Sequence, residues 1–301
     1  MQHGRSRSAA APVEAPFLRT LGASIGALDA QHARLDLPYR DGNANRNGSL
    51  HGGVVAAAID VVAATLACEG LDAERRARSS TIDLTVHYLA PAVREDVHAT
   101  AMLLRRGRDI TFVEVQVATA GGKQIARGLV AHRAGPDRAR KAAATAAGVP
   151  FERERAIEDP TAERMLAARP SGSPFTARIG VVSTQLGRGR AVSLLPRQDD
   201  LLAEDGTVHE GALAALVDCA GGAAAWSIDG FNPHGSAATI GMHLCFDVST
   251  RDEDVLAEAV NSWCSDGVYV NSVTVAGRSS GRAIASGSVT YRIVPRTPRR
   301  A

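Results

Sequence analysis

The chain has 301 residues, of which 45% are hydrophobic and 22% are charged, and its formal net charge is +2. This composition is ordinary for a soluble globular protein of about two domains. The small net charge argues against a general nucleic-acid binder, because no field of one sign dominates the surface. No stretch approaches the roughly 20 apolar residues that span a bilayer, so we expect no membrane partner. Four scattered cysteines without Cys-x-x-Cys spacing favour reduced thiols in a cytoplasm and argue against zinc or any other metal site.

The composition along the chain predicts two domains with a linker between them. Residues 1–16 are rich in Ala, Arg, Pro and Ser, which predicts a disordered tail. The domains are expected at 17–133 and 175–294. The linker at 134–174 opens on a Gly-Pro pair, contains a helix-forming stretch and ends in a Pro- and Ser-rich hinge, so we expect it to be partly helical. Residues 295–301 are expected to fray.

Each domain shows the same order of predicted elements. A short strand leads into an Asn/Gly or Asp/Gly loop, and an apolar helix of about 15 to 18 residues follows, starting near Gly48 or Gly206. The helix is apolar almost all round, which predicts burial. Strands then follow at 81–88, 96–104, 111–118 and 124–133 in the first domain, and at 239–246, 254–263, 268–276 and 282–293 in the second. One buried helix followed by antiparallel strands indicates the α+β class.

The two domains repeat one pattern of residues. His51 and Asp60 are nine residues apart, as are His209 and Asp218, and the two pairs are offset by 158 residues. Further matches at this offset are Phe17 with Phe175, Gly22 with Gly180, Leu37 with Leu195, Gly48 with Gly206, and Thr81 with Thr239. A constant offset over this span indicates two copies of one domain.

The two aspartates are the first candidates for chemistry. Asp60 and Asp218 each sit within an apolar helix, where an unpaired carboxylate costs several kcal/mol unless its pKa rises or it finds a partner. Such a carboxylate can act as a general base toward water or attack an acyl carbon itself. Alternatively, Asp60 or Asp218 only forms a hydrogen bond with a neighbouring strand or the backbone and takes no part in chemistry. The repeated spacing to a His-x-Gly motif favours a site in at least one copy.

Two motifs of the first copy resemble those of the phenylacetate-type (PaaI-like) hotdog acyl-CoA thioesterases. They are Asn45-Arg-Asn-Gly-Ser-Leu-His51-Gly-Gly53 and Thr81-Ile-Asp-Leu-Thr-Val-His-Tyr-Leu-Ala-Pro91. The resemblance covers about residues 43–133 and is weaker in the second copy. It implies two fused hotdog domains, each a central helix wrapped by a curved antiparallel sheet. It also implies an acyl-CoA thioesterase without a further cofactor, and a homodimer of this chain.

The resemblance and elementary chemistry together suggest roles for the motif residues. The amide of Gly52, at the start of the helix, would polarise a thioester carbonyl and stabilise its oxyanion. Asn45 would donate a hydrogen bond to the carbonyl or to the attacking water, and the resemblance implies that Thr81 and Thr239 position that water. His51 either lines the site or caps the helix. Each residue also has a purely structural alternative: Asn45 can be an ordinary loop residue, and Thr81 and Thr239 can be ordinary strand residues. For Gly53, a role in helix–sheet packing explains the residue as well as a role in the site does.

The resembled family builds its sites between two domains, so we expect two composite sites. The first would join Asn45, His51 and Gly52 to Asp218 and Thr239. The second would join His209, Glu210 and Gly211 to Asp60 and Thr81. The second copy has Ala203 in place of Asn45 and Glu210 in place of Gly52. Because the charge of Glu210 would repel an oxyanion, we expect the first site to be the stronger catalyst.

Two other functions remain open from the sequence. Hotdog domains also act as enoyl-CoA hydratases or dehydratases, although the Asp-His pair and the His-Phe-Pro run typical of those enzymes are absent from this sequence. A non-catalytic acyl-CoA-binding protein is the second alternative. A serine hydrolase is not expected: Gly22-Ala-Ser-Ile-Gly26 and Gly277-Arg-Ser-Ser-Gly281 match the string Gly-x-Ser-x-Gly, but neither joins a predicted strand to a predicted helix as a nucleophile elbow does. It identifies neither the acyl group nor the residues that would bind the CoA nucleotide.

Overall fold

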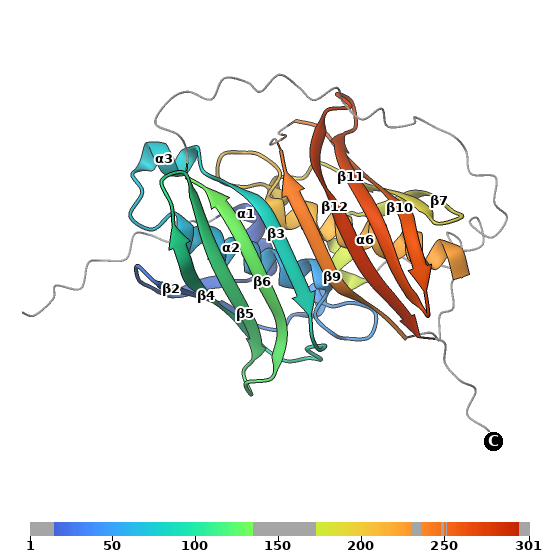
Figure 1. The fold of residues 1–301 in the computed structure, drawn as a ribbon, viewed down its shortest axis with the longest axis horizontal. Helices are drawn as coiled ribbons and strands as arrows, with labels where there is room; N and C mark the ends of the chain where they lie inside the picture. The colour runs from blue at the N-terminus through green and yellow to red at the C-terminus, as the bar shows by residue number, and fades with distance from the viewer. Residues whose placement is uncertain (1–14, 135–172, 230–235, 248–249, 251, 295–301) are drawn as a thin grey trace, which may run out of the picture.

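The protein is described by a computed structural model over residues 15–134, 173–229, 236–247, 250 and 252–294. The expected tails, apart from residues 15 and 16, and nearly all of the expected linker lie outside these ranges. The strands form one twelve-stranded antiparallel sheet, and the two long helices lie together on one face of it (Figure 1). Two hotdog domains thus share a continuous sheet, which confirms the α+β class.

The long helix and the four strands after it follow the predicted order in both halves, whereas the short helices at Pro16–Leu21, Ala73–Ala77 and Pro174–Arg178 were not predicted. In the first half the helices and strands are α1 (Pro16–Leu21), β1 (Ser24–Leu28), β2 (His32–Leu37), α2 (Gly52–Ala67), α3 (Ala73–Ala77), β3 (Ser80–Tyr88), β4 (Val97–Arg106), β5 (Ile110–Thr119) and β6 (Gln124–Arg133). In the second they are α5 (Pro174–Arg178), β7 (Val182–Gly187), β8 (Arg190–Leu195), α6 (Glu210–Asp229), β9 (Ser236–Phe246), β10 (Val255–Ser265), β11 (Val268–Gly277) and β12 (Ala283–Val294).

The prediction erred at the start of each half. The single first strand is a two-stranded hairpin, β1 with β2 and β7 with β8. The long helices begin at Gly52 and Glu210, four residues beyond the expected Gly48 and Gly206. Gly48 and Gly206 have φ values of 73° and 80°. This left-handed conformation suits a turn and is incompatible with a right-handed helix.

The two halves join where β3 pairs with β9 at the centre of the sheet (Figure 1). Each of these strands carries a register irregularity, at Ile82 in the ladder between β3 and β6 and at Ile240 in the ladder between β9 and β12. A β-bulge turns the following side chains to the other face of the sheet. In a regular strand, Thr81 would face the opposite side of the sheet from Leu84 and Val86. Because of the bulge at Ile82, all three side chains face inward and are buried. Asp83 and Thr85 alternate with these core residues and face outward.

The long helices α2 and α6 pack closely against each other through small residues. A Cβ atom on Gly53 would lie 2.5 Å from the Cα of Ala215, and one on Gly211 would lie 2.7 Å from the Cβ of Ala57. Contrary to the expectation that no segment reaches membrane-spanning length, Glu210–Ile228 is long and apolar enough to cross a bilayer. Because 89% of that segment is buried inside the protein, its apolar character is that of a core helix.

Candidate active site between the two halves

The first candidate site forms where α6 of the second half meets the start of α2 in the first. The Asp218 side chain is only 7% exposed, and its Oδ2 lies 3.4 Å from Nδ1 of His51. Thr239 donates a hydrogen bond to the other oxygen of this carboxylate. A Cβ atom on Gly52 would lie 2.8 Å from Asp218 Oδ2, so only glycine leaves room for the carboxylate in this position.

The Gly52 amide differs from the amides that follow it in the first turn of α2. Gly53 donates to Nδ1 of His51 at 3.1 Å, and Val54 and Val55 donate to the His51 carbonyl at 3.0 and 3.2 Å. Within the part of the chain that the structure describes, no group accepts from the Gly52 N–H. A donor at the positive end of a helix dipole, beside a carboxylate, is suited to polarising a carbonyl.

His51 is the N-cap of α2, which is one of the two roles left open by the sequence. Burial lowers the pKa of His51, although the Asp218 charge raises it in part, so the ring is neutral at pH 7. Because Nδ1 accepts from the Gly53 amide, the proton of the neutral ring resides on Nε2. The ring packs on Phe175 of the second half with centroids 5.1 Å apart. His51 therefore caps the start of α2 and packs it against the second half.

Sequence reasoning missed Tyr88, which belongs to the same site. Its hydroxyl donates to the Gly52 carbonyl at 2.9 Å. Burial, and secondarily the Asp218 charge, raise the pKa of Tyr88 well above its ordinary value, so the phenol keeps its proton. Tyr88 lies within the resembled motif at 81–91, but an aromatic residue at the end of a strand has many structural explanations.

Asn45 lies in the loop before α2, and its side-chain hydrogen bonds are local. Its side-chain oxygen accepts from the backbone N–H groups of Asn47 at 2.8 Å and Ser49 at 3.1 Å. This is the Asx-turn geometry in which a short side chain stabilises a loop. No hydrogen bond or ion pair joins Asn45 to Asp218 among the described residues, and its side-chain NH₂ is not used in the turn. A donor role toward substrate stays a prediction.

The second candidate site brings together the corresponding residues of the opposite halves. Thr81 donates to Asp60 Oδ1 at 2.6 Å, and His132 Nδ1 lies 3.2 Å from the same hydroxyl. His209 caps α6 by accepting from Gly211 at 2.9 Å, and its Nδ1 lies 4.0 Å from Asp60 Oδ2. His132 was not identified from the sequence, because it lies in the predicted strand at 124–133 without a motif around it.

Glu210 changes the chemistry of this second site. It stands at the position of Gly52, and its carboxylate, Asp60 and His209 each place a polar atom within 4.8 Å of the others. Burial, followed by the nearby Asp60 charge, raises the pKa of Glu210 to about 8, while its own backbone N–H opposes the rise. Glu210 thus places a carboxyl group beside Asp60 at the position where Gly52 has no side chain. Burial raises the pKa of Asp60 to about 6 against the lowering effect of Thr81.

This carboxyl pair predicts a dependence of stability on pH. Because both folded-state pKa values are raised, the folded protein binds more protons than the unfolded chain. The resulting stabilisation is complete below about pH 4 and is lost as the pH rises toward about 8. Glu210→Gln is therefore expected to reduce the loss of unfolding free energy between pH 5 and pH 8 by up to about 3 kcal/mol.

Urea unfolding at several pH values measures this effect. Glu204→Gln, which changes an exposed glutamate of the preceding loop, is the matched control and should retain the wild-type slope. An equal pH dependence of the unfolding free energy in wild type and Glu210→Gln would show that folding does not raise the pKa of Glu210.

Comparison with known proteins places the chain in a family. Residues 4–132 match a family described as "Domain of unknown function (DUF4442)". The medium/long-chain acyl-CoA thioesterase YigI of Escherichia coli K12 is 36% identical over 117 residues, which cover 34% of this chain and 74% of YigI.

Two solved structures share the fold over nearly the whole chain. The tesB protein MAP1729c of Mycobacterium avium subs. paratuberculosis has a TM-score of 0.64 at 12% identity, covering 93% of this chain and 98% of that protein. A hot dog fold protein of unknown function from Alicyclobacillus acidocaldarius has a TM-score of 0.61 at 16% identity, covering 91% and 97%. The chain belongs to the hotdog-fold thioesterase family. It is a thioester hydrolase.

Proposed function

We propose that the protein is a PaaI-like acyl-CoA thioesterase whose principal active site is the composite of Asp218, Thr239 and Gly52. One observation carries this proposal: the Asp218 carboxylate of one half lies against Gly52, where the first amide of the other half's helix has no acceptor among the described residues. A base and an oxyanion donor side by side are the two groups that acyl transfer to water requires.

In the proposed reaction the thioester carbonyl accepts a hydrogen bond from the Gly52 amide. Asp218 takes a proton from water as the water oxygen bonds to the carbonyl carbon, and the oxyanion forms at the amide. Collapse of this intermediate breaks the carbon–sulfur bond, and the leaving CoA thiolate takes the proton held by Asp218, which restores the carboxylate. Thr239 fixes one carboxylate oxygen and leaves the other beside Gly52. Direct attack by Asp218, with hydrolysis of the resulting anhydride, would use the same arrangement.

The second site is proposed to be weak or inactive. Glu210 places a carboxyl group where Gly52 leaves space, and this group lies within 4.8 Å of the Asp60 carboxylate. A substrate carbonyl would have to displace it and would then face two acidic groups, Glu210 and Asp60. Loss of the amide donor alone removes about 10²- to 10³-fold in rate from sites of this kind.

The acyl chain is proposed to be of medium or long length. Support comes from the Escherichia coli relative, whose name gives medium/long-chain acyl-CoA as its substrate. A homodimer of this chain and a cytoplasmic location stay predictions from the sequence.

Release of free thiol from short, medium, long and aromatic acyl-CoA substrates tests the proposal. Wild-type protein is expected to release CoA, fastest from medium or long chains, and Asp218→Asn is the matched inactive control. Binding of acyl-CoA without thiol release would instead indicate a binding protein. Water addition to an enoyl-CoA without thiol release would indicate a hydratase.

A further inference from the structure

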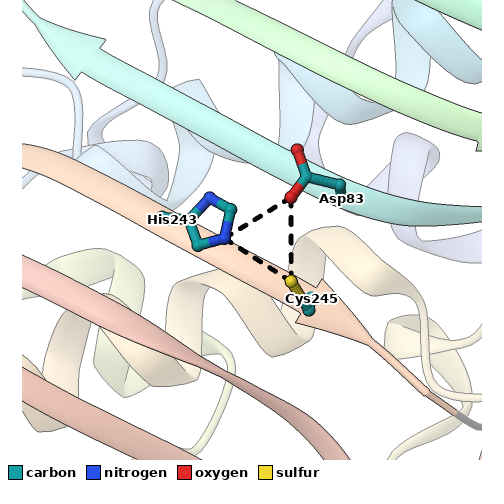
Figure 2. A group of neighbouring side chains, drawn as sticks. All are labelled: Asp83, His243 and Cys245. Atoms are coloured by element: carbon teal, nitrogen blue, oxygen red, sulfur yellow. Dashed lines mark hydrogen bonds and ion pairs between the residues drawn. The ribbon is translucent and has the colours of Figure 1, made fainter.

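Three metal-binding types of side chain converge on the outer face of the sheet, where β3 of the first half pairs with β9 of the second (Figure 2). His243 Nε2 lies 3.4 Å from Asp83 Oδ2 and 3.5 Å from Cys245 Sγ. Cys245 Sγ lies 3.7 Å from the same oxygen of Asp83. This cluster is separate from the candidate active site, because Thr81 and Thr239 precede the bulges at Ile82 and Ile240 and face the helices.

The arrangement does not have the order of a catalytic Cys-His-Asp relay. In a relay the carboxylate holds one ring nitrogen and the nucleophile contacts the other. Here Asp83 and Cys245 both face Nε2 of His243, as Figure 2 shows. The other nitrogen, Nδ1, lies 2.9 Å from the Thr85 hydroxyl. Three possible ligand atoms therefore surround one point instead of forming a chain.

The distances between these atoms fit the edges of a metal coordination tetrahedron. Zn²⁺ binds nitrogen and oxygen at about 2.0 to 2.1 Å and sulfur at about 2.3 Å, so tetrahedral angles place neighbouring ligand atoms about 3.3 to 3.6 Å apart. The observed separations are 3.4, 3.5 and 3.7 Å. The nitrogen–oxygen separation exceeds the roughly 2.7 to 3.2 Å of an ordinary hydrogen bond between these elements.

Thr85 supplies the outer contact expected of a metal-binding histidine. When Nδ1 carries the proton and donates it to the Thr85 hydroxyl, the lone pair of Nε2 points toward Asp83 and Cys245. The backbone pairing fixes this geometry, because Asp83 is the direct partner of Cys245 and Thr85 is that of His243. Direct cross-strand partners hold their Cβ atoms about 4.5 to 5.5 Å apart.

We propose that Asp83, His243 and Cys245 bind one Zn²⁺ ion across the junction of the two halves. Thiolate, imidazole and carboxylate form a mixed ligand set that zinc accepts. On binding, the Cys245 thiol releases its proton to solvent and the sulfur bonds to the metal. The His243 and Asp83 side chains are 46% and 32% exposed, so water completes the fourth position. The ion links β3 to β9 through side chains in addition to their backbone hydrogen bonds.

The repeat does not generate a second such site. At the 158-residue offset, Asp83 corresponds to Gly241, Cys245 to His87 and His243 to Thr85. No sequence motif predicts this cluster, because the ligands come from two strands 160 residues apart and lack the short spacings of zinc motifs. The proposal therefore replaces the expectation of no metal.

Metal titration of the full chain tests the proposal. After treatment with a chelator, the protein is titrated with Co²⁺ and then with Zn²⁺ in competition with a chromophoric chelator. We expect one equivalent of Co²⁺ with a thiolate-to-metal charge-transfer band, displaced by one equivalent of Zn²⁺. Cys245→Ser should abolish the band, and Asp83→Asn and His243→Gln should each weaken Zn²⁺ binding by at least about tenfold.

The matched controls change an exposed cysteine on β10 and a neighbouring histidine on β3. Cys264→Ser and His87→Gln should retain the band and the wild-type affinity. All variants should keep thioesterase activity, which also shows that they fold, because the cluster lies on the face away from the helices. A spectrum without a thiolate band, or a band that survives Cys245→Ser, would overturn the proposal. The proposal would also be overturned if Glu210→Gln lost Zn²⁺ binding while the Asp83, His243 and Cys245 variants kept it. The ion would then be bound at the second candidate site.

Discussion

Asp218→Asn is expected to lower kcat for acyl-CoA hydrolysis by about 10³-fold, the central value for loss of a positioned general base. The amide cannot take a proton from water or attack the carbonyl, although it retains the shape of the carboxylate. Thr239 can still donate to the remaining oxygen, so the local hydrogen bond is preserved. The measurement is steady-state thiol release, with circular dichroism to show that the variant is folded.

Asp60→Asn is the matched control for this prediction. It makes the same chemical change at the equivalent position of the other half, where Thr81 donates to the carboxylate. Because the Glu210 carboxyl group stands where the first site leaves space for a substrate carbonyl, activity should fall by less than about twofold, far below the 10²- to 10⁴-fold effect of removing a working base. A larger loss in Asp60→Asn than in Asp218→Asn would reverse the assignment of the two sites.

Gly52→Ala is expected to lower kcat by about 10²-fold, the effect of a misplacement of about 1 Å in an active site. The added Cβ would lie 2.8 Å from Asp218 Oδ2, so the carboxylate must move. The substitution should not weaken α2, since alanine has the higher helix propensity by about 1 kcal/mol. Activity and the thermal midpoint are measured together, and the midpoint should be nearly unchanged.

Gly53→Ala separates this effect from helix packing. Its Cβ would lie 2.5 Å from the backbone of Ala215, so α2 and α6 must separate. Overpacking of this kind costs about 1 to 3 kcal/mol of unfolding free energy. Activity loss should therefore dominate in Gly52→Ala and stability loss in Gly53→Ala. A Gly52→Ala protein with full activity would show that Asp218 does not act beside this glycine.

The pattern of apolar residues was sufficient to predict most of the fold. All eight long strands after the central helices begin and end within three residues of their expected positions, because each alternates or forms an apolar run between turn residues. The first strand of each half was predicted too simply. The β1–β2 and β7–β8 hairpins are short and partly exposed, so their hydrophobic pattern is weak.

The candidate site was predictable where the repeat marked it. The matching His-x-Gly and Asp spacings indicated which residues to compare, and the structure brings Asp218 to Gly52 and Asp60 to Glu210. The orientation of His51 was not predictable, since capping depends on where the helix begins. Tyr88 and His132 were missed because the repeat marks neither: at the 158-residue offset they correspond to Phe246 and Thr290.

The sequence by itself determined the two-copy organisation, the buried helices, the strands and the acidic residue within each helix, because these follow from periodicity and from the cost of burying charge. Only the tertiary structure decided which residues meet across the halves. The pairing of β3 with β9 and the crossing of α2 with α6 join residues about 160 positions apart, and no local pattern specifies such a pairing. The same long-range pairing brings Asp83, His243 and Cys245 together on the outer face.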